Sequence, residues 1–558
     1  MIIGREKCIQ FLQEELNKQT EDFKLKLDTS AVDLLLNKNE VFLALFVNFM
    51  ANGEMILKFP ASRPLPRKND FFYCFTLPNA IRSYKNWGGM SYRNLIERET
   101  KATEVKCIWQ STSDDSNFYL VGFKGVSEDF REYIEKVPNG VVTLGPNVPP
   151  FEYLANLIKI SKFNHPKCAY VLDMNYETSS WAPTLLDSNS DLISVLRGEY
   201  KNTDVVVLQG PPGTGKTSRI SDLCSALCAK GKSVLVTALT NRALMEVAVK
   251  LKDTQLMTNS SVFKTNLTTD ESREVPKLQV AENVHAMPGK LMLSTFYTTS
   301  GVAANNIDDL IFDYVIVDEA SQAFLPMLAA ANMLGDKNLW VGDIRQMPPV
   351  VQLSRERIKR MRFEPVIEGL DTIVNSNKHQ IYQLTDTFRL GTRAAKFTGL
   401  FYNNTLKSKS VLNGLFEQKD GPIVLPIDMT IGDIRPANAI EQVVELVEDL
   451  LSKDKKLEIA ILSHQIKTVE AIQTEVAKQI GMKKNILVET VARVQGITKD
   501  VTIYLIPDTD SKLYCLESRL FNVATSRAKM NTYIICPKNI LDFSYMPTEV
   551  RLFLSQLF

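Results

Sequence analysis

The stretch LQGPPGTGKTS, residues 208–218, decides how the rest of the chain is interpreted. Four of its positions match the phosphate-binding pattern G-x-x-x-x-G-K-[ST], namely Gly210, Gly215, Lys216 and Thr217. The apolar run TDVVVLQ before it is typical of a buried parallel strand, and the run TSRISDLCSALCAKG after it has helical spacing and ends in a glycine. A strand, a glycine-rich loop and a helix in this order predict a site for nucleotide phosphates.

The chemistry expected of this loop follows from its residue types. Glycines let backbone N–H groups surround phosphate oxygens, and the start of the helix adds its positive dipole end. We expect Lys216 to reach the β- and γ-phosphates and Thr217 to hold Mg²⁺. With one carboxylate from a later motif, the predicted nucleotide-binding residues are Gly210, Pro211, Pro212, Gly213, Thr214, Gly215, Lys216, Thr217, Ser218 and Asp318.

Composition sets the class of protein. The chain has 558 residues, 45% of them hydrophobic and 23% charged, which is typical of a soluble globular protein with several domains. Its net charge is +1, so any contact with nucleic acid must come from local patches. The eight cysteines form no C-x-x-C pair, which argues against a zinc module and predicts reduced thiols in the cytoplasm. We expect no secretory signal and no membrane span.

The order of apolar runs predicts the domain organisation. Residues 1–165 have a helical start and then short strand-like runs, which indicate an α+β accessory region with a small β-rich module. Residues 166–190 are expected to form a connector. Residues 191–365 and 366–558 each alternate strands and helices, which predicts two parallel sheets covered by helices. The polar stretch 258–276 is interpreted as a loop.

Two further motifs add charged and polar groups at strand ends. In DYVIVDEASQ, Asp318 can bind Mg²⁺ and Glu319 can orient the attacking water as a general base. In LWVGDIRQMPP, Gln346 can hydrogen-bond a γ-phosphate or its water and would sense whether the phosphate is present. We expect Asp343 and Gln346 to emerge at the same sheet edge as Asp318.

Two arginines after residue 366 are candidates for transition-state contacts. Arg389 lies in LTDTFRLG, and Arg527 lies in SRLFNVATSRAK on an expected helix before a strand. A guanidinium fork spreads positive charge over phosphate oxygens, which suits this role.

Eight motifs in this order resemble those of the superfamily-one helicases, in particular the group with the RNA helicase of nonsense-mediated decay and the nidovirus helicases. The resemblance covers about residues 186–540 and is carried by GPPGTGKT, TALTNRALMEV, LMLSTF, VDEASQA, VGDIRQMPP, TDTFRLG, TVARVQGITKDV and NVATSRAK. It implies two RecA-like domains in tandem, with ATP and Mg²⁺ in the cleft between them. The catalytic residues would be Lys216, Glu319 and Gln346 from the first domain and the arginine fingers Arg389 and Arg527 from the second.

The same resemblance implies a single-stranded DNA or RNA partner that lies across both domains, and movement from 5′ to 3′. The positions that match its nucleic-acid contacts are Thr240, Asn241, Ser294, Thr295, Gln495 and Gly496. Hydroxyl and amide side chains bind phosphate and sugar without reading bases, so we expect a motor that is indifferent to sequence.

Several positions depart from the family pattern. Ser190 stands where a glutamine often reads adenine, and Thr498 replaces the usual glutamate after the Gln-Gly pair. His464 either stacks on a base or is an ordinary strand-end residue. The basic run 354–365 either contacts phosphates or forms a solvated helix face.

Three functions compete on the sequence alone. The first is an ATP-driven helicase or translocase. The second is a nucleic-acid-sensing ATPase in a defence or repair complex that switches state without unwinding, with the N-terminal region docking a protein partner. The third is a ring-forming remodeller, which the second α/β domain and its own candidate arginines argue against.

Overall fold

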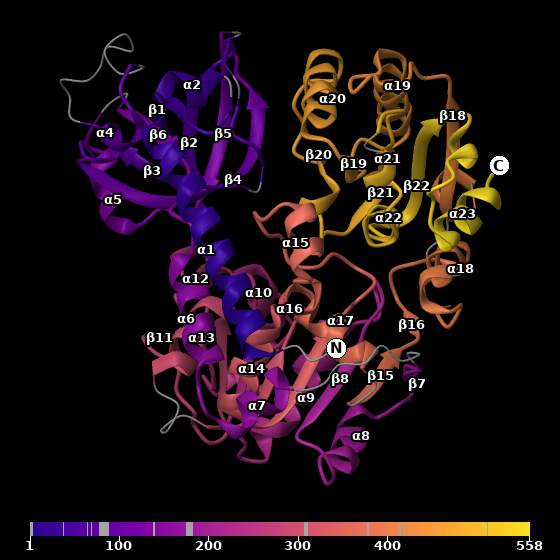
Figure 1. Cartoon of the computed structure of the whole chain (residues 1–558). Helices are drawn as coiled ribbons and strands as arrows, with labels where there is room; N and C mark the ends of the chain where they lie inside the picture. The colour runs from indigo at the N-terminus through magenta and orange to yellow at the C-terminus, as the bar shows by residue number, and fades with distance from the viewer. Residues whose placement is uncertain are drawn as a thin grey trace.

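The computed structural model describes residues 4–36, 38–63, 65–68, 70–77, 89–115, 117–137, 140–173, 182–305, 311–376, 379–411, 414–417, 419–510 and 512–558. Among these residues, no helix combines the length and the apolar character needed to cross a membrane. The chain forms two parallel sheets in tandem after a helical stalk and a β-barrel (Figure 1). The predicted fold class is therefore confirmed.

The N-terminal region consists of the stalk α1 (Arg5–Asp28), the helices α2 (Ala31–Leu36), α4 (Tyr92–Ile96) and α5 (Glu128–Ile134), and a closed barrel. The barrel order is β1 (Phe42–Phe49), β2 (Met55–Pro60), β5 (Phe118–Lys124), β4 (Lys101–Thr112), β3 (Phe71–Thr76) and β6 (Val141–Gly145). Alternate residues of β2 are buried, as the pleat of a half-buried strand requires. Closure leaves no free sheet edge. The sequence did not single out β6, which completes this closure.

The first large sheet is parallel at every pairing within the described residues. Its order is β11 (Gln279–Ala281), β10 (Val262–Thr265), β12 (Leu291–Thr295), β9 (Val234–Ala238), β13 (Phe312–Val317), β14 (Gly335–Gly342), β8 (Val205–Gln209), β15 (Gln380–Leu384) and β7 (Thr184–Leu186). Val205 and Val207 point into one hydrophobic core, and Val206 and Leu208 point into the core on the opposite face. Both faces of the sheet are therefore covered, which explains why β8 is a continuous apolar run.

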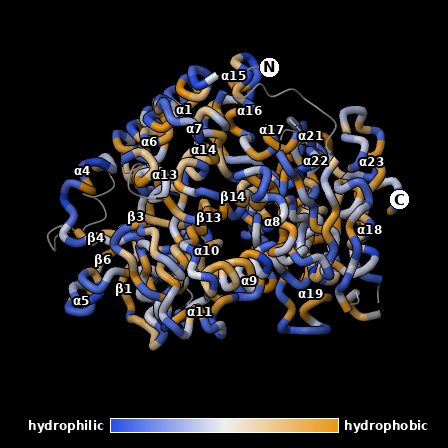
Figure 2. Tube along the Cα trace, turned by 90° about the horizontal axis from the view of Figure 1, so that it is seen from below, coloured by the Kyte–Doolittle hydropathy of each residue, from blue (hydrophilic) through white to orange (hydrophobic). Residues whose placement is uncertain are grey.

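Helices cover the two faces of this sheet. They are α6 (Phe151–Ser161), α7 (Pro166–Leu172), α8 (Leu192–Glu199), α9 (Lys216–Ala229), α10 (Asn241–Lys250), α11 (Gln255–Thr258), α12 (Thr269–Glu274), α13 (Phe296–Asn305), α14 (Leu325–Leu334), α15 (Arg355–Met361), α16 (Glu364–Ile367) and α17 (Gly369–Asn375). Every residue of α14 is buried, and most of its residues are hydrophobic (Figure 2). A helix that is apolar all round belongs in the interior of a large core.

Two features of this region differ from the sequence interpretation. The stretch 258–276, which was expected to be a loop, contains β10 and α12. The strands β15 and β7 pair with each other, and β15 also pairs with β8 of the first sheet, although the expected domain limits place β15 after residue 365 and β7 in a connector. The division of the chain into domains at those limits stays a prediction.

The second large sheet is also parallel, in the order β18 (Gly421–Ile427), β22 (Ala528–Pro537), β21 (Lys499–Leu505), β19 (Ile459–Ser463) and β20 (Ile486–Thr490). A two-stranded ribbon, β16 (Asp386–Thr387) and β17 (Lys407–Ser408), precedes it. The helices around the sheet are α18 (Thr392–Gly399), α19 (Ala437–Lys453), α20 (Ile466–Gln479), α21 (Lys512–Cys515), α22 (Ser518–Thr525) and α23 (Thr548–Ser555).

The stalk α1 is anchored on the first sheet domain. Phe11 is fully buried and makes edge-to-face ring contacts with Phe324 and Phe363. The buried carboxylate of Glu15 accepts hydrogen bonds from two backbone N–H groups, those of Gln352 at 2.8 Å and Leu353 at 3.1 Å. These contacts fix the base of the stalk and therefore the position of the barrel.

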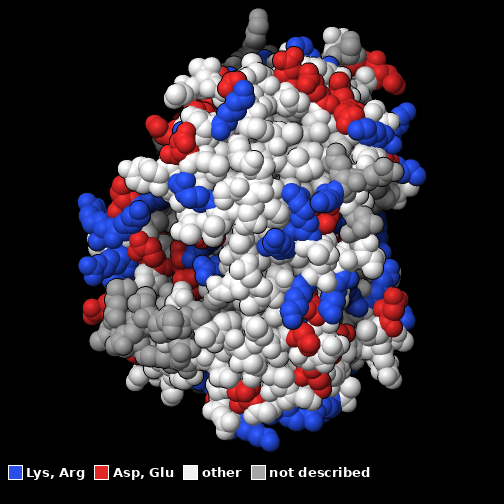
Figure 3. Space-filling view, turned by 90° about the vertical axis from the view of Figure 1, so that its right-hand side faces the viewer, with Lys and Arg blue, Asp and Glu red and all other residues white. Residues whose placement is uncertain are grey.

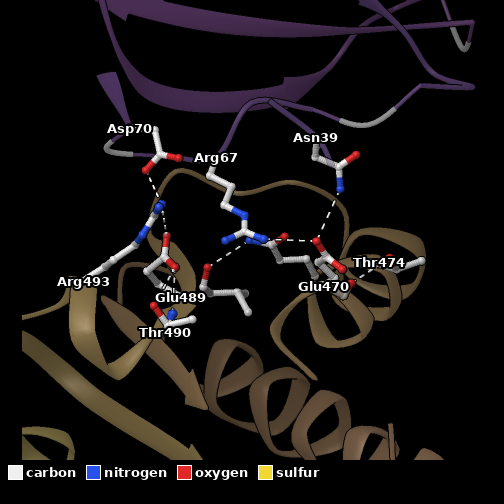
Figure 4. Close-up of polar contacts among 10 residues, drawn as sticks. Asn39, Arg67, Asp70, Glu470, Thr474, Glu489, Thr490 and Arg493 are labelled. Atoms are coloured by element: carbon white, nitrogen blue, oxygen red, sulfur yellow. Dashed lines mark hydrogen bonds and ion pairs between the residues drawn. The ribbon is translucent and has the colours of Figure 1, made fainter. Parts of the chain in front are cut away.

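The barrel also contacts the second sheet domain (Figure 4). Glu470 of α20 binds Arg67 at 3.1 Å and Asn39 at 3.3 Å, and Asp70 forms an ion pair with Arg493. Lys68 donates to two backbone carbonyls beside β20. We call this set of contacts the barrel bridge. On the face shown in Figure 3, positive and negative side chains are interspersed, in keeping with the small net charge.

Candidate functional site

The phosphate-binding loop leaves the carboxyl end of β8 and enters α9 at Lys216. Gly213 and Gly215 have φ of 73° and 78°, the left-handed region that favours glycine. At Gly210, a Cβ would lie 2.3 Å from Cγ of Lys216, so only glycine lets the lysine cross the loop. The Lys216 ammonium donates a 3.0 Å hydrogen bond to the Gly210 carbonyl. The predicted loop geometry is thus present in the structure.

The loop is held against the segment that carries Arg389. The Thr387 hydroxyl donates to the Pro212 carbonyl at 2.9 Å, and the Phe388 N–H donates to the Gly213 carbonyl at 2.8 Å. A Cβ at Gly213 would lie 2.5 Å from Cβ of Arg389. The phosphate-binding loop and the first candidate arginine finger are therefore in direct contact.

Two carboxylates follow β13 beside this loop. Asp318 is buried, and the Glu319 N–H donates to its Oδ1 at 2.9 Å. Burial and, next, the charge of Glu319 raise the pKa of Asp318 to about 7, while Lys216 opposes the shift. The Glu319 Oε2 atom is buried and has no hydrogen-bond partner in the described part of the chain. A pair of neighbouring carboxylates, one of them with an oxygen that lacks a donor, in a cavity that Thr217 also lines fits a hydrated divalent cation.

Arg389 and Arg527 line the same cavity of about 2060 Å³ as Lys216, Glu319 and Gln346. Burial and, next, the charge of Arg527 lower the pKa of Arg389 to about 9, while carboxylates including that of Glu319 oppose the shift. The Arg527 Nε donates to the Val523 carbonyl at 3.0 Å, which fixes the guanidinium against α22. A half-buried guanidinium and a buried one that repel each other form a site for a polyanion, because a phosphate would neutralise both.

Gln346 is oriented by a hydrogen bond to Asp343. The Gln346 Nε2 atom donates to Asp343 Oδ2 at 2.7 Å, and Gln209 Nε2 donates to Asp343 Oδ1 at 2.6 Å. A carboxylate only accepts hydrogen bonds, so the amide nitrogen of Gln346 must face Asp343. The amide oxygen of Gln346 is then free to accept a hydrogen bond from a water, whereas a phosphate oxygen offers no proton.

The six predicted nucleic-acid contacts fall into two groups. Thr240 and Asn241 are exposed at the start of α10, and Gly496 lines the large cavity. Gln495 accepts a 3.2 Å hydrogen bond from Gln322, which follows the Asp318–Glu319 pair. Ser294 and Thr295 are buried, at 0% and 8% exposure. The Ser294 hydroxyl accepts a hydrogen bond from Thr265. In this arrangement the Ser294 hydroxyl therefore faces the interior, and its role as a backbone contact stays a prediction.

Two departures from the family pattern have definite surroundings. Ser190 lines the cavity and donates to Asp187 at 2.8 Å. The ring of His464 stacks on Tyr514 with centroids 5.4 Å apart, which matches the interpretation of an ordinary strand-end residue.

Most of the basic run forms α15, and two of its arginines make internal contacts. Arg357 binds both carboxylate oxygens of Glu14 on the stalk at 2.7 Å. The Arg355 guanidinium lies 4.1 Å from the centroid of the Tyr514 ring. These contacts attach the first sheet domain to the stalk and to the second domain.

Sequence reasoning missed two residues that lie next to the site. Tyr402 and Asn522 are fully buried and hydrogen-bond the turn that carries Asp343. Asn522 lies within the quoted motif NVATSRAK, so the motif itself was a signal for it. Tyr402 belongs to an aromatic run, LFY, that is also typical of an ordinary core.

Two family models match the chain, each described as an AAA domain, over residues 196–352 and 370–539. Among curated proteins, the DNA replication ATP-dependent helicase/nuclease DNA2 of Saccharomyces cerevisiae is 27% identical over 288 residues, which cover 50% of this chain and 18% of that protein. The human protein of the same name is 30% identical over 218 residues, which cover 37% and 20%. The chain thus spans about a fifth of the length of these relatives. A solved arterivirus helicase, nonstructural protein 10, matches at 12% identity and a TM-score of 0.37, over 88% of this chain and 78% of that one.

Proposed function

Because the chain belongs to the superfamily-one helicases, we propose that it is an ATP-driven motor that moves on single-stranded nucleic acid. One observation carries this proposal. A single cavity is lined by Lys216, Glu319 and Gln346 from the first sheet domain and by Arg389 and Arg527 from the second. Groups from both domains would therefore act on the same three phosphates, so that nucleotide binding and hydrolysis would close and open the cleft.

Nucleotide binding would rest on the glycine-rich loop. Its backbone N–H groups would surround the phosphates, and the ammonium of Lys216 would exchange the Gly210 carbonyl for phosphate oxygens. Thr217 and Asp318 would hold Mg²⁺, which supplies charge neutralisation between the β- and γ-phosphates when bound. Ser190 offers one hydroxyl near this cavity and no amide to read adenine, so we expect weak discrimination among nucleoside triphosphates.

Hydrolysis would rest on groups that already have the required orientation. The free Oε2 atom of Glu319 would accept a proton from the attacking water, and the amide oxygen of Gln346 would hold that water in line. Arg389 and Arg527 would bind the charge that develops on the transferred phosphoryl group, and their mutual repulsion would favour closure around it.

Movement requires a strand that contacts both domains. We propose that its backbone contacts Thr240 and Asn241 at the start of α10 in the first domain and Gly496 in the second, while Gln495 links the strand to the Asp318–Glu319 pair through Gln322. A role for Ser294 and Thr295 would require exposure of their side chains. Direction from 5′ to 3′ and a protein partner at the N-terminal region belong to the same proposal. The eight cysteines are buried free thiols, which supports a reducing, cytoplasmic compartment.

The test is ATP hydrolysis by the whole chain, measured in parallel with single-stranded DNA, single-stranded RNA and duplexes. We expect single strands to stimulate the rate at least tenfold and a duplex with a 5′ overhang to be unwound. The absence of stimulation by every nucleic acid would contradict the proposal. Stimulated hydrolysis without strand release would indicate the switch that the sequence left open.

A further inference from the structure

We propose that Tyr402 is a positioning residue that couples the phosphate-sensing turn of the first sheet domain to the arginine-bearing helix α22 of the second. The phosphate-sensing turn is residues 343–346, which contain Asp343 and Gln346. The inference rests on the proposed function, because it assigns the route by which the two halves of the ATP site would act together.

The side chain of Tyr402 crosses the boundary between the two sheet domains. Tyr402 is fully buried in the hydrophobic core of the second domain, which also contains Phe521 and Leu462. Its hydroxyl leaves that core and donates a 2.7 Å hydrogen bond to Oδ2 of Asp343 in the first domain. A phenol with an apolar body and one polar tip suits such a position, because the tip finds its partner across the domain boundary.

Asp343 connects this hydroxyl to the ATP site through one atom. Oδ2 accepts from both Tyr402 and the amide nitrogen of Gln346, each at 2.7 Å. The other oxygen accepts from Gln209 and from the Arg345 N–H. All four hydrogen bonds lie in a buried site, where a carboxylate without donors would be costly. A rotation of Gln346 toward a bound phosphate or water would therefore remove one of the two donors to the oxygen that Tyr402 binds.

Asn522 carries the connection into α22. Its Nδ2 donates to the Tyr402 hydroxyl at 2.8 Å and to the Arg345 carbonyl at 2.8 Å. The sensing turn is thus held by two hydrogen bonds from the second domain, one from Tyr402 and one from Asn522. Any opening of the cleft at this point must break both bonds or move the turn.

The same helix ends at the candidate arginine fingers. Arg527 follows α22 and is bonded to it through the Val523 carbonyl. Arg389 donates a long 3.5 Å hydrogen bond to the Ser526 carbonyl. A displacement of α22 therefore moves both guanidinium groups relative to the phosphates. This arrangement gives a short physical path from Gln346 through Asp343, Tyr402 and Asn522 to the fingers.

The decisive variant is Tyr402→Phe, which removes only the hydroxyl. Asp343 Oδ2 keeps Gln346, and Asn522 keeps the Arg345 carbonyl, so each former partner retains a hydrogen bond. The matched control is Tyr504→Phe. Tyr504 is equally buried in the same core and donates to the Cys515 carbonyl at 2.8 Å, away from the first domain. Tyr402→Phe loses two buried hydrogen bonds and Tyr504→Phe loses one, so we expect Tyr402→Phe to lose somewhat more stability.

We expect the two variants to have thermal midpoints within a few degrees of each other and to differ in catalysis. Tyr504→Phe should keep the rate of the natural chain with and without single strands. Tyr402→Phe should lower kcat in the presence of single strands about tenfold and change the KM for ATP less than about twofold. If Tyr402 only supported the core, Tyr402→Phe would behave like Tyr504→Phe. Both variants would then lose stability, and neither would change kcat or KM.

A double-mutant cycle with Asn522→Ala tests the path itself. If Tyr402 and Asn522 act through one connection, the second substitution should add little to the loss of kcat caused by the first. Additive losses, or a Tyr402→Phe variant with the stimulated rate of Tyr504→Phe, would overturn the inference. A natural chain that no nucleic acid stimulates would instead refute the proposed function, so the two failures are distinguishable.

Discussion

Glu319 holds a left-handed backbone conformation, with φ 51° and ψ 41°, which costs a non-glycine residue about 1–3 kcal/mol. Its carboxylate oxygen Oε2 is buried without a donor in the described part of the chain. Backbone strain and an unpaired carboxylate oxygen at one residue are typical of an active site, where the surrounding structure holds a catalytic side chain in position. Neither feature would be favoured by stability alone.

We therefore expect Glu319→Gln to lower the turnover of ATP by about 10²–10⁴-fold, because the amide cannot accept the water's proton in the same way. Nucleotide affinity should change less than twofold, since the amide keeps the shape of the side chain. Single-turnover hydrolysis and binding of a non-hydrolysable ATP analogue measure the two effects. Full turnover in the variant would mean that another group is the base.

Gly213 offers a second test at the same scale, with Gly231 as its matched control. Their φ values, 73° and 77°, are nearly equal, so Ala at either position costs about 1–2 kcal/mol of backbone strain. Only at Gly213 would the new Cβ meet other atoms, those of Arg389 and Thr387. We expect Gly231→Ala to lose stability alone and Gly213→Ala also to lose at least tenfold in ATP turnover. Equal turnover of the two would show that the contact between the loop and the Arg389 segment is dispensable.

The residues of the site differ in how readily the sequence predicted them. The phosphate-binding loop and the Asp318–Glu319 pair are local patterns. The residues of each motif are neighbours in sequence, and those of the loop lie between the end of β8 and the start of α9. The role of Tyr402 depends on Asp343, which lies 59 positions away, so no local pattern indicates it. The burial of Ser294 depends in the same way on Thr265 in a neighbouring strand.

At the scale of single elements, β8 and α9 were predictable and β10 with α12 were not. Strand β8 is apolar on both faces, and a short continuous apolar run of this kind is typical of a buried parallel strand. Strand β10 contains Lys264, which is fully buried because its ammonium pairs with Glu271 at 3.0 Å. A charged residue inside a strand makes the segment look like a surface loop, since pairing that permits burial is visible only in three dimensions.

The stalk α1 gives a prediction at this scale. Glu15 accepts two backbone N–H groups, those of Gln352 and Leu353. In Glu15→Gln the amide nitrogen would face one of these donors, so we expect a loss of about 1–3 kcal/mol in the free energy of unfolding. The neighbouring Glu14→Gln breaks a partly exposed pair with Arg357 and should cost less than about 1 kcal/mol. Urea titrations compare the two, and equal losses would show that Glu15 does not anchor the stalk.

At the scale of the whole molecule, the barrel contacts both sheet domains. It reaches α12 through a hydrogen bond from the Gly125 N–H to Asp270 at 3.1 Å, and it reaches the second domain through the barrel bridge (Figure 4). The stalk, the barrel and the two sheet domains thus form a closed series of contacts. Sequence could not predict this closure, because residues such as Asp70 and Arg493 are more than 400 positions apart.

This closure predicts that the barrel bridge slows the release of a bound strand. Arg493→Glu would place a negative side chain opposite Asp70 and beside Glu489, so the bridge would open. An exposed pair is worth up to about 1 kcal/mol, so we expect a labelled single strand to dissociate about fivefold faster in the presence of a non-hydrolysable ATP analogue. The effect should fade at high salt, because screening weakens the natural pair.

The control is the exchanged pair, Asp70→Arg with Arg493→Glu, which restores opposite charges with reversed polarity. If the bridge retains the strand, the exchanged pair should recover most of the slow dissociation, because attraction between the barrel and the second domain returns. If Arg493 instead binds the strand's phosphates directly, the exchanged pair should release the strand as fast as Arg493→Glu alone. Dissociation that is unchanged in Arg493→Glu would mean that the contact between barrel and second domain has no part in holding nucleic acid.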